Sequence, residues 1–292
     1  MDTLRGIALM TLAMASFAVE DMIIKMLAEK MPLGQILLFI GLFGAIAFGM
    51  MARSRNVSVW SPVLLTPPLL LRNLAEVLGT VLFVTAIGLL PLSVVASILQ
   101  AAPLFVALGG AVFLGAPVGW RRWLAIAVGF VGVLMILRPG ADSFEPLALL
   151  ALGATICLSI RDLTTRAAPR DTPYLVLTTS GFVMVTIAGL VLMPFGAPPV
   201  WPDGISWLLL VFAIGAAMVA YTSITAAMRI GDLAAVTPFR YTRLLFSLAI
   251  GVMVFDERPD LMTLAGAAVI LGSGLYTLLR ERQVALSAAR TS

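Results

Sequence analysis

Residues 205–228 read ISWLLLVFAIGAAMVAYTSITAAM, a run of 24 residues without a charge. A helix of about 20 apolar residues is long enough to cross the hydrocarbon layer of a bilayer. The rest of the chain has the same character, since 61% of its 292 residues are hydrophobic and only 12% are charged. Ordinary soluble domains carry about 25% charged residues. The sequence therefore predicts an all-α integral membrane protein embedded in the lipid bilayer, and it excludes a soluble enzyme.

Apolar runs separated by charged residues, prolines or glycine clusters predict ten spans. Their expected bounds are 4–27, 33–52, 67–90, 92–114, 120–137, 146–166, 173–193, 205–228, 232–254 and 260–280. The connections are short, so neighbouring helices are expected to be antiparallel. The first span carries Glu20, Asp21 and Lys25, and no small-residue cleavage site follows it. We therefore expect it to be a permanent span and not a cleaved signal.

The basic residues predict the orientation of the spans. With a cytoplasmic N-terminus, eleven Lys and Arg residues fall in inner segments, and four (Lys25, Lys30, Arg138 and Arg258) fall in outer segments. Cytoplasmic loops of membrane proteins are enriched in these residues. We therefore expect both termini on the cytoplasmic side of a bacterial inner membrane. The same rule accounts for the net charge of +4, so no nucleic-acid partner is expected.

The chain contains an internal repeat. A shift of 141 residues aligns the halves without a gap, placing Asp21 on Asp162, Lys25 on Arg166, Pro32 on Pro173 and Trp60 on Trp201. Each half has five spans, an odd number, so the second half is predicted to be inverted relative to the first. The expected units are 1–140 and 141–280, followed by a cytoplasmic tail, 281–292. Inverted repeats are typical of secondary transporters, whose substrate site lies between the halves. The alternative is a duplication kept only for folding.

Charged residues inside the spans mark a candidate site. Eight are predicted there: Glu20, Asp21, Glu76, Asp162, Arg72, Arg161, Arg240 and Arg243. Such residues are costly in a bilayer and usually face a cavity or a partner. Arg72 and Glu76 are four residues apart and share a helix face. The repeat places Glu20 and Asp21 at the outer end and the Arg161 and Asp162 pair at the inner end. Our hypothesis is that they form two gates, and the alternative is static ion pairing.

The ninth span carries the most informative pattern. Thr237, Arg240, Arg243 and Ser247 recur at spacings of three, three and four, which is one face of a regular helix. The two arginines need carboxylates from other helices, water or an anionic substrate group. A guanidinium can bond both oxygens of a carboxylate. The predicted substrate-binding residues are Arg240, Arg243, Tyr241, Thr237, Gln100, Ser97, Tyr221 and Phe17.

These residues favour transport of a small molecule with a carboxylate and an apolar side chain, such as an amino acid. An organic-cation exporter would need an unpaired acid at the site, and an organic-anion carrier of the sugar-phosphate type is the other transporter alternative. An enzyme is not expected, because the chain has no His and one Cys, so neither a metal site nor a cofactor is predicted. A non-transporting scaffold would not need arginines in mid-membrane. Energy coupling stays open between facilitated transport and a titrating carboxylate, with Glu20, Asp21 and Glu76 as candidates.

Small residues predict close helix packing in the fifth and tenth spans. They occur as Ala125-xxx-Gly129 and Ala268-xxx-Gly272. Such spacing lets helix backbones approach each other. It would serve the two halves of one chain or two copies of it, so we expect a monomer or a weak homodimer.

The two repeat ends carry a resemblance to a known family. Its residues are Pro91-Leu92-Ser93, Ala102-Pro103-Leu104-Phe105 and Leu114-Gly115 in the first half, and Gly231-Asp232-Leu233, Phe255-Asp256-Glu257-Arg258 and Gly266 in the second. They resemble the drug/metabolite transporter superfamily in its ten-helix EamA-type form. Glu257 fits the acidic residue with which family repeats end their fourth helix, whereas the first half has Ala116 there. Pro103 fits the family's fourth-helix proline, whereas the second half has Leu244.

The segment Thr237-Pro238-Phe239-Arg240-Tyr241 is most similar to bacterial YddG-type exporters of aromatic amino acids. The resemblance implies export of amino acids across the inner membrane by alternating access. It also implies a central cavity built from the first, third, fourth, sixth, eighth and ninth spans.

Overall fold

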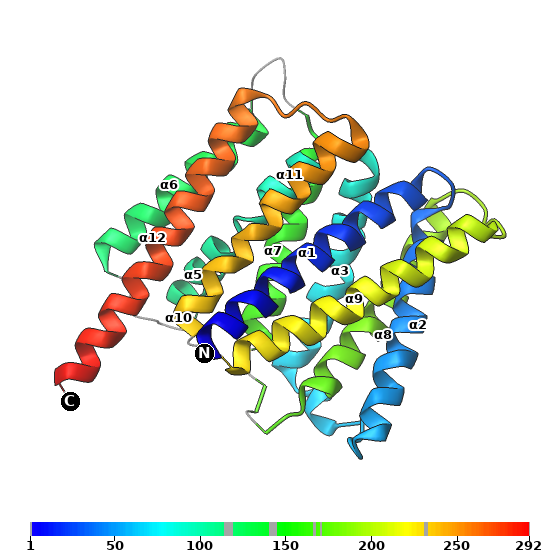
Figure 1. Ribbon diagram of the computed structural model, residues 1–292, viewed down its shortest axis with the longest axis horizontal. Coiled ribbons are helices and arrows are strands. Elements are labelled where there is room, and N and C mark those ends of the chain that lie inside the picture. Colours follow the sequence, from blue (N-terminus) through cyan, green and yellow to red (C-terminus); the bar gives the residue numbers. More distant parts are fainter. Residues whose placement is uncertain are drawn as a thin grey trace.

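The protein is a bundle of long helices (Figure 1). The structure is a computed structural model that describes residues 2–113, 119–139, 145–165, 168–169, 171–230 and 233–291. The predicted repeat positions Ala116 and Arg166 lie outside these ranges. In the described ranges the long helices are α1 (Asp2–Ala28), α2 (Leu33–Ser54), α3 (Pro67–Leu89), α6 (Trp120–Leu137), α7 (Ala148–Thr165), α8 (Tyr174–Leu192), α9 (Gly204–Ile230) and α12 (Leu261–Thr291). The remaining elements are η1 (Pro62–Leu65), α4 (Leu92–Leu99), α5 (Ala102–Phe113), η2 (Met193–Phe195), α10 (Leu233–Val236), η3 (Thr237–Tyr241) and α11 (Thr242–Phe255).

The helices are long and apolar enough for a multi-pass membrane protein. Nine segments of the described chain qualify as membrane spans by length and composition, and α6 adds a shorter apolar stretch, Trp123–Leu137. In α3, Leu70, Leu74 and Leu78 are 50%, 55% and 48% exposed on the outside of the bundle. On the opposite side of the same helix, Arg72 and Glu76 are buried. The apolar exterior and polar interior confirm the prediction of an all-helical membrane protein.

The fourth and ninth spans are each broken in the middle. α4 ends at Leu99 and α5 begins at Ala102, just before Pro103. Proline has no N–H and cannot continue the helical hydrogen bonds, so it interrupts a helix. In the ninth span Pro238 lies in η3, a 3₁₀ turn between α10 and α11. The expectation of one regular helix over 232–254 was therefore wrong, and the 3₁₀ turn changes which side chains share a face with Arg240.

The helices pack in a pattern that the internal repeat explains. α1 packs on α9, and α3 packs on α7. The other three pairings are α2 with α8, α4 with α11, and α6 with α12. Exchanging the two halves turns the first pair into the second and leaves the pairs α2 with α8 and α6 with α12 unchanged. The contact of α4 with α11 stays a contact between the fourth and the ninth span. The contacts therefore follow a pseudo-two-fold relation between the halves, as an inverted repeat requires. The division into units 1–140 and 141–280 and the tail 281–292 stays a prediction, although α12 continues through Thr291.

Two helix crossings depend on glycine. A Cβ atom on Gly34 of α2 would lie 2.9 Å from the carbonyl oxygen of Gly189 in α8, and one on Gly132 of α6 would lie 2.8 Å from that of Gly266 in α12. Of the predicted small-residue spacings, Ala125 and Gly129 are buried, whereas Ala268 and Gly272 are exposed. Within this chain the close crossing of α6 and α12 is therefore made by Gly132 and Gly266.

We name the two ends of the bundle by the predicted orientation. The inner end holds the N-terminus of α1, the C-termini of α7 and α9 and the N-terminus of α8 (Figure 1). The outer end holds the α1–α2, α3–α4 and α11–α12 connections and the start of α9. At this end Asp203 caps α9, since the Ser206 N–H donates to its Oδ1 atom at 2.6 Å. This hydrogen bond lowers the pKa of the exposed Asp203 carboxyl. The orientation itself stays a prediction.

Candidate functional site

A cavity of about 760 Å³ lies between the two halves of the bundle. Side chains from α1–α5, α7–α9, η3, α11 and α12 line it. Thr165 and Tyr174 line it at the inner end, whereas Ile24 and Leu37 lie at its limit in the outer half. The cavity thus runs from the inner end of the bundle into its outer half. Its size is within the range of about 300–1,000 Å³ that is typical of small-molecule pockets.

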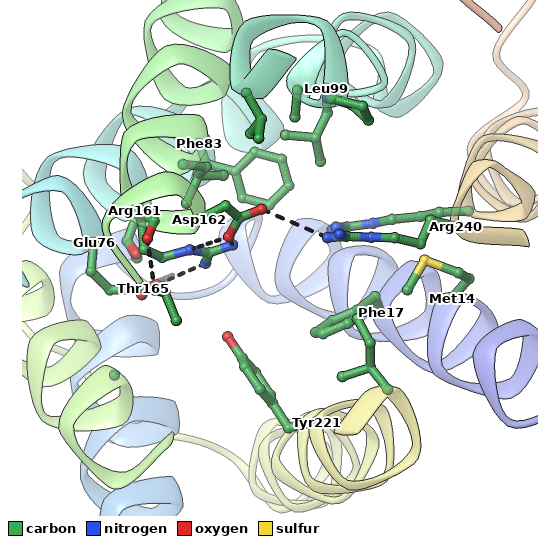
Figure 2. A pocket seen from close by; sticks show the side chains of 18 of the residues that line it. Met14, Phe17, Glu76, Phe83, Leu99, Arg161, Asp162, Thr165, Tyr221 and Arg240 are labelled. Carbon is green, nitrogen blue, oxygen red and sulfur yellow. Dashed lines mark hydrogen bonds and ion pairs between the residues drawn. The ribbon is translucent and has the colours of Figure 1, made fainter. Parts of the chain in front are cut away.

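A chain of alternating charges crosses one wall of this cavity (Figure 2). Arg72 Nη2 lies 3.6 Å from a carboxylate oxygen of Glu76, and Glu76 Oε1 accepts from Arg161 Nη1 at 3.1 Å. Arg161 also donates to Asp162 at 2.8 Å, and Asp162 Oδ2 lies 3.7 Å from Arg240 Nη2. Arg161 and Asp162 were expected at an inner gate. The structure places both on the cavity wall, where they join α3 to η3.

The second central arginine, Arg243, is held by α1. Its Nε and Nη2 atoms both donate to Asp21 Oδ2, at 3.2 Å and 2.6 Å. Its guanidinium also lies 5.2 Å from the ring centroid of Phe17 and 5.6 Å from that of Phe83. Asp21 is buried, so this pair is shielded from water. Arg243 therefore has its charge neutralised within the protein, whereas the Arg240 side chain is 39% exposed.

Aromatic rings form the opposite wall. Phe17 and Tyr221 meet edge to face, with their centroids 5.3 Å apart, and Tyr221 makes the same kind of contact with Phe182 at 5.3 Å. Figure 2 shows Phe17 and Met14 across the cavity from Glu76, next to Arg240, and Tyr221 between the two sides with its hydroxyl pointing into the cavity. Edge-to-face contacts hold such rings in fixed orientations. The cavity therefore offers an apolar surface facing a row of charges.

The polar residues predicted near the two helix breaks differ in their access to the cavity. Gln100 and Thr237 line it. Ser97 is fully buried and donates to the Ser93 carbonyl at 2.6 Å, and the cavity lining in the described chain does not include it. Ser247 is also fully buried outside the lining, because the 3₁₀ turn ends the predicted face.

Tyr241 contributes its ring and not its hydroxyl to the cavity wall. Its hydroxyl is buried and has no hydrogen-bond partner in the part of the chain that the structure describes. The hydroxyl packs so close to Gly274 that a Cβ atom there would lie 1.8 Å from it. Tyr241 thus joins the break of the ninth span to α12.

Glu20 differs from the other three acids of the cavity. It lines the cavity beside Asp21 and lies in the electrostatic field of Arg243. Within the described residues it makes neither a hydrogen bond nor an ion pair, whereas Asp21, Glu76 and Asp162 each face an arginine. Glu20 and Asp21 were expected to form an outer gate together. In the structure Asp21 forms the ion pair with Arg243 and Glu20 lines the cavity, and the outer gate stays a prediction.

The outer end is closed by a residue that the sequence reasoning did not select as a site, Glu257. Its carboxylate accepts from the N–H groups of Leu92 and Ser93, at 2.5 Å and 2.9 Å, where α4 begins. Lys25 Nζ lies 3.5 Å from the same carboxylate and donates to the Leu90 carbonyl at 2.5 Å. These contacts join α1 and the α3–α4 connection to the α11–α12 connection, so they link the two halves. Two features of the sequence could have pointed to this contact. Lys25 is predicted at the outer end, and Glu257 fits the acidic residue of the family.

The cavity offers no grouping suited to a metal ion. In the described part of the chain, no three His, Cys, Asp or Glu side chains are placed to hold one. Three of the cavity acids, Asp21, Glu76 and Asp162, instead face guanidinium groups, which can donate hydrogen bonds to an organic ligand.

Comparison with known proteins places the chain in a family. Residues 4–138 and 146–279 both match the EamA-like transporter family. An S-adenosylmethionine uptake transporter of Rickettsia conorii is 24% identical, over 96% of this chain and 94% of that protein. A riboflavin transporter of Vibrio cholerae is 31% identical, over 69% of this chain and 68% of that protein. A pseudopaline exporter, CntI, of Pseudomonas aeruginosa is 27% identical, over 91% of this chain and 93% of that protein.

A solved crystal structure shares the fold. It superimposes with a TM-score of 0.64 at 20% identity, covering 97% of this chain and 98% of that chain. The similar proteins are named as carriers of different metabolites, and they do not support the expected YddG-type specificity, which stays a prediction. The chain is a membrane transporter of small metabolites, and it belongs to the EamA-like transporter family.

Proposed function

We propose that the protein carries a zwitterionic metabolite with an apolar or aromatic part, an amino acid or a derivative of one, across a bacterial inner membrane by alternating access. The observation that carries this proposal is Arg240. Its side chain is 39% exposed, against 8%, 22% and 18% for Arg72, Arg161 and Arg243, and it lies beside Phe17 in the cavity (Figure 2).

Arg240 suits the carboxylate of such a substrate. It lies 3.7 Å from Asp162, too far for a short charge-assisted hydrogen bond, which is about 2.7–2.9 Å long. Asp162 is already bonded to Arg161 at 2.8 Å. A substrate carboxylate can therefore accept hydrogen bonds from the N–H groups of Arg240, and Asp162 keeps its bond to Arg161.

The balance of charge in the cavity favours a substrate with no net charge. Four acids and four arginines line it: Glu20, Asp21, Glu76, Asp162, Arg72, Arg161, Arg240 and Arg243. A sugar-phosphate-like anion would need a surplus of positive charge, and the Asp21 carboxylate already neutralises Arg243. An organic cation is the second candidate, because Glu20 is a carboxylate without an ion pair in the described chain.

The size of the cavity and the similar proteins support a substrate at least as large as an amino acid. A volume of about 760 Å³ leaves room for a nucleoside or a second side chain beside the charged groups. Two similar proteins are named for S-adenosylmethionine and pseudopaline. One is named for uptake and the other for export, so the expected direction, export, stays a prediction.

The inequality of the two ends supports alternating access. The cavity reaches the inner end, whereas Lys25 and Glu257 join the halves at the outer end. Inverted repeats have two related packings, one open to each side. In this proposal the arrangement that α1 and α9 have in one packing is the arrangement that α3 and α7 have in the other. The Glu257 contacts break when the outer side opens.

Uptake into proteoliposomes tests the proposal. The probes are phenylalanine, S-adenosylmethionine, riboflavin, glucose 6-phosphate and tetraphenylphosphonium, each with and without a pH gradient. We expect uptake of at least one of the two zwitterions and a loss of that uptake in Arg240→Gln. Arg121→Gln is the matched control, since Arg121 lies on α6 outside this cavity. Uptake of the phosphate or the cation alone would overturn the proposal.

A further inference from the structure

We infer that Glu20 binds the cationic group of the transported molecule, so that the cavity selects substrates bearing an ammonium or a sulfonium. The inference rests on the proposed function and adds to it the residue that reads the positive charge. It assigns the two charges of a zwitterion to two residues. Arg240 of the η3 turn binds the carboxylate, and Glu20 of α1 binds the cation.

The first argument is the state of the four cavity acids. Asp21 is bonded to Arg243, Glu76 to Arg161, and Asp162 lies between Arg161 and Arg240. Glu20 makes no such contact in the described part of the chain. A carboxylate placed within a membrane without a cation costs several kcal/mol. Such a group avoids the cost by taking up a proton or by meeting a cation, and Glu20 lines the cavity, where a bound cation would supply that partner.

The second argument is that Arg243 cannot serve Glu20 in the observed arrangement. Both its Nε and its Nη2 atoms donate to Asp21 Oδ2. Its Cζ atom lies over the rings of Phe17 and Phe83. The guanidinium is therefore held by Asp21 and the two rings and acts on Glu20 only through its electrostatic field, which leaves the Glu20 carboxyl open to a cationic group in the cavity.

The third argument is the line of side chains that α1 presents. Met14, Phe17, Glu20, Asp21 and Ile24 all line the cavity from this helix. Residues three and four apart lie one above the other on a helix, so Glu20 is about one turn, roughly 5 Å, beyond Phe17. η3, which carries Arg240, packs against the same helix. A zwitterion bound along α1 can thus reach Arg240 with its carboxylate and Glu20 with its cation while its side chain covers Phe17.

This arrangement predicts selection by charge as well as by shape. A molecule that lacks the cation would leave Glu20 unpaired, and one that lacks the carboxylate would lose its contact with Arg240. Removing one charged partner of a buried hydrogen bond weakens binding by a factor of about 10–100. The wild-type protein should therefore prefer the zwitterion over both analogues with a single charge.

The test uses three probes that differ by one charged group. They are phenylalanine, 3-phenylpropionate, which lacks the ammonium, and phenethylamine, which lacks the carboxylate. Initial uptake rates are measured in proteoliposomes for the wild type, Glu20→Gln and Glu20→Asp. We expect Glu20→Gln to lower phenylalanine uptake about tenfold or more and to leave 3-phenylpropionate uptake unchanged, while Glu20→Asp keeps most of the preference for phenylalanine.

Glu29→Gln is the matched control, because Glu29 is an exposed acid at the end of the same helix and does not line the cavity. Thermal unfolding of each variant identifies any loss of fold. A phenylalanine to 3-phenylpropionate ratio that is the same in Glu20→Gln as in the wild type overturns the role of Glu20 and leaves the proposed function standing. If Glu20→Gln changes only the response to a pH gradient, Glu20 carries protons and the inference is wrong. Failure of the wild type to move any zwitterion overturns the proposed function itself.

Discussion

Lys25 of α1 and Glu257 of the α11–α12 connection form an ion pair at the outer end of the bundle, with Nζ 3.5 Å from Oε1. The pair comes from opposite halves of the repeat. Glu257 also takes the place of a helix cap, since it accepts from the first two N–H groups of α4. A negative charge at a helix N-terminus is stabilising. In the sequence the position equivalent to Glu257 in the first half is Ala116, so the carboxylate of this contact has no counterpart in the other repeat.

Neutralising Glu257 should open the outer end. The change to Gln removes the charge that holds both N–H groups and Lys25, and hydrogen bonds to charged groups contribute about 1.5–3 kcal/mol each. The readout is labelling of a cysteine at position 24 by a membrane-impermeant maleimide added from the outer side. Ile24 lies at the outer limit of the cavity, and Cys157 can be replaced by Ala to leave a single thiol. We expect the labelling rate to rise about tenfold.

Asp260→Asn is the control for this change. Asp260 bonds to Arg138 at the same end of the bundle, but its side chain is 53% exposed, and such surface pairs contribute little. Equal labelling rates in Glu257→Gln and Asp260→Asn would show that Glu257 does not hold the outer end closed.

The two central arginines should respond differently to substitution. Arg243→Gln leaves the buried Asp21 without a partner, and breaking a buried ion pair in this way costs roughly 3–5 kcal/mol. We therefore expect Arg243→Gln to lower the melting temperature of the detergent-solubilised protein, followed by the fluorescence of its five tryptophans. Arg240→Gln should leave that temperature close to the wild-type value, because its side chain is partly exposed.

The double variant Asp21→Asn/Arg243→Gln separates charge from packing. It removes both members of the pair, so it should recover much of the stability that Arg243→Gln loses. A double variant as unstable as Arg243→Gln alone would mean that Arg243 stabilises the fold through Phe17 and Phe83 and not through Asp21.

The crossing of α2 and α8 should not tolerate a methyl group. A Cβ atom on Gly189 would lie 2.5 Å from the backbone nitrogen of Leu38. Overpacking of this kind costs about 1–3 kcal/mol. We expect Gly189→Ala to lower the melting temperature by several degrees, whereas Gly49→Ala on α2 should not, because nothing lies within 4 Å of that position. Equal melting temperatures would indicate that the two helices can move apart at little cost.

The helices could be predicted from the sequence because their ends are marked by charge and proline. The predicted span 120–137 has the same bounds as α6, and the predicted span 33–52 differs from α2 only at its end. The two helix breaks could not be placed in this way. Pro103 and Pro238 are visible in the sequence, but whether a proline bends or interrupts a membrane helix depends on the groups that neighbouring helices offer to the freed backbone.

The charges of the site could be predicted more readily than their partners. Residues such as Asp21 and Arg243 were expected to face a cavity because a bilayer excludes charge. Their pairing joins positions 222 residues apart and depends on how α1 packs against α11. Glu257 gave a still weaker signal, since it lies outside the spans and accepts from backbone N–H groups, which any sequence supplies.

The measurement that tests the central claim most directly is the ratio of phenylalanine to phenethylamine uptake in proteoliposomes of the wild type and of Arg240→Gln. If Arg240 binds the carboxylate of a zwitterion, the wild type prefers phenylalanine, and the substitution lowers the ratio about tenfold while the protein keeps its melting temperature. A ratio that is the same in both proteins would contradict the assignment of this cavity to a zwitterionic substrate.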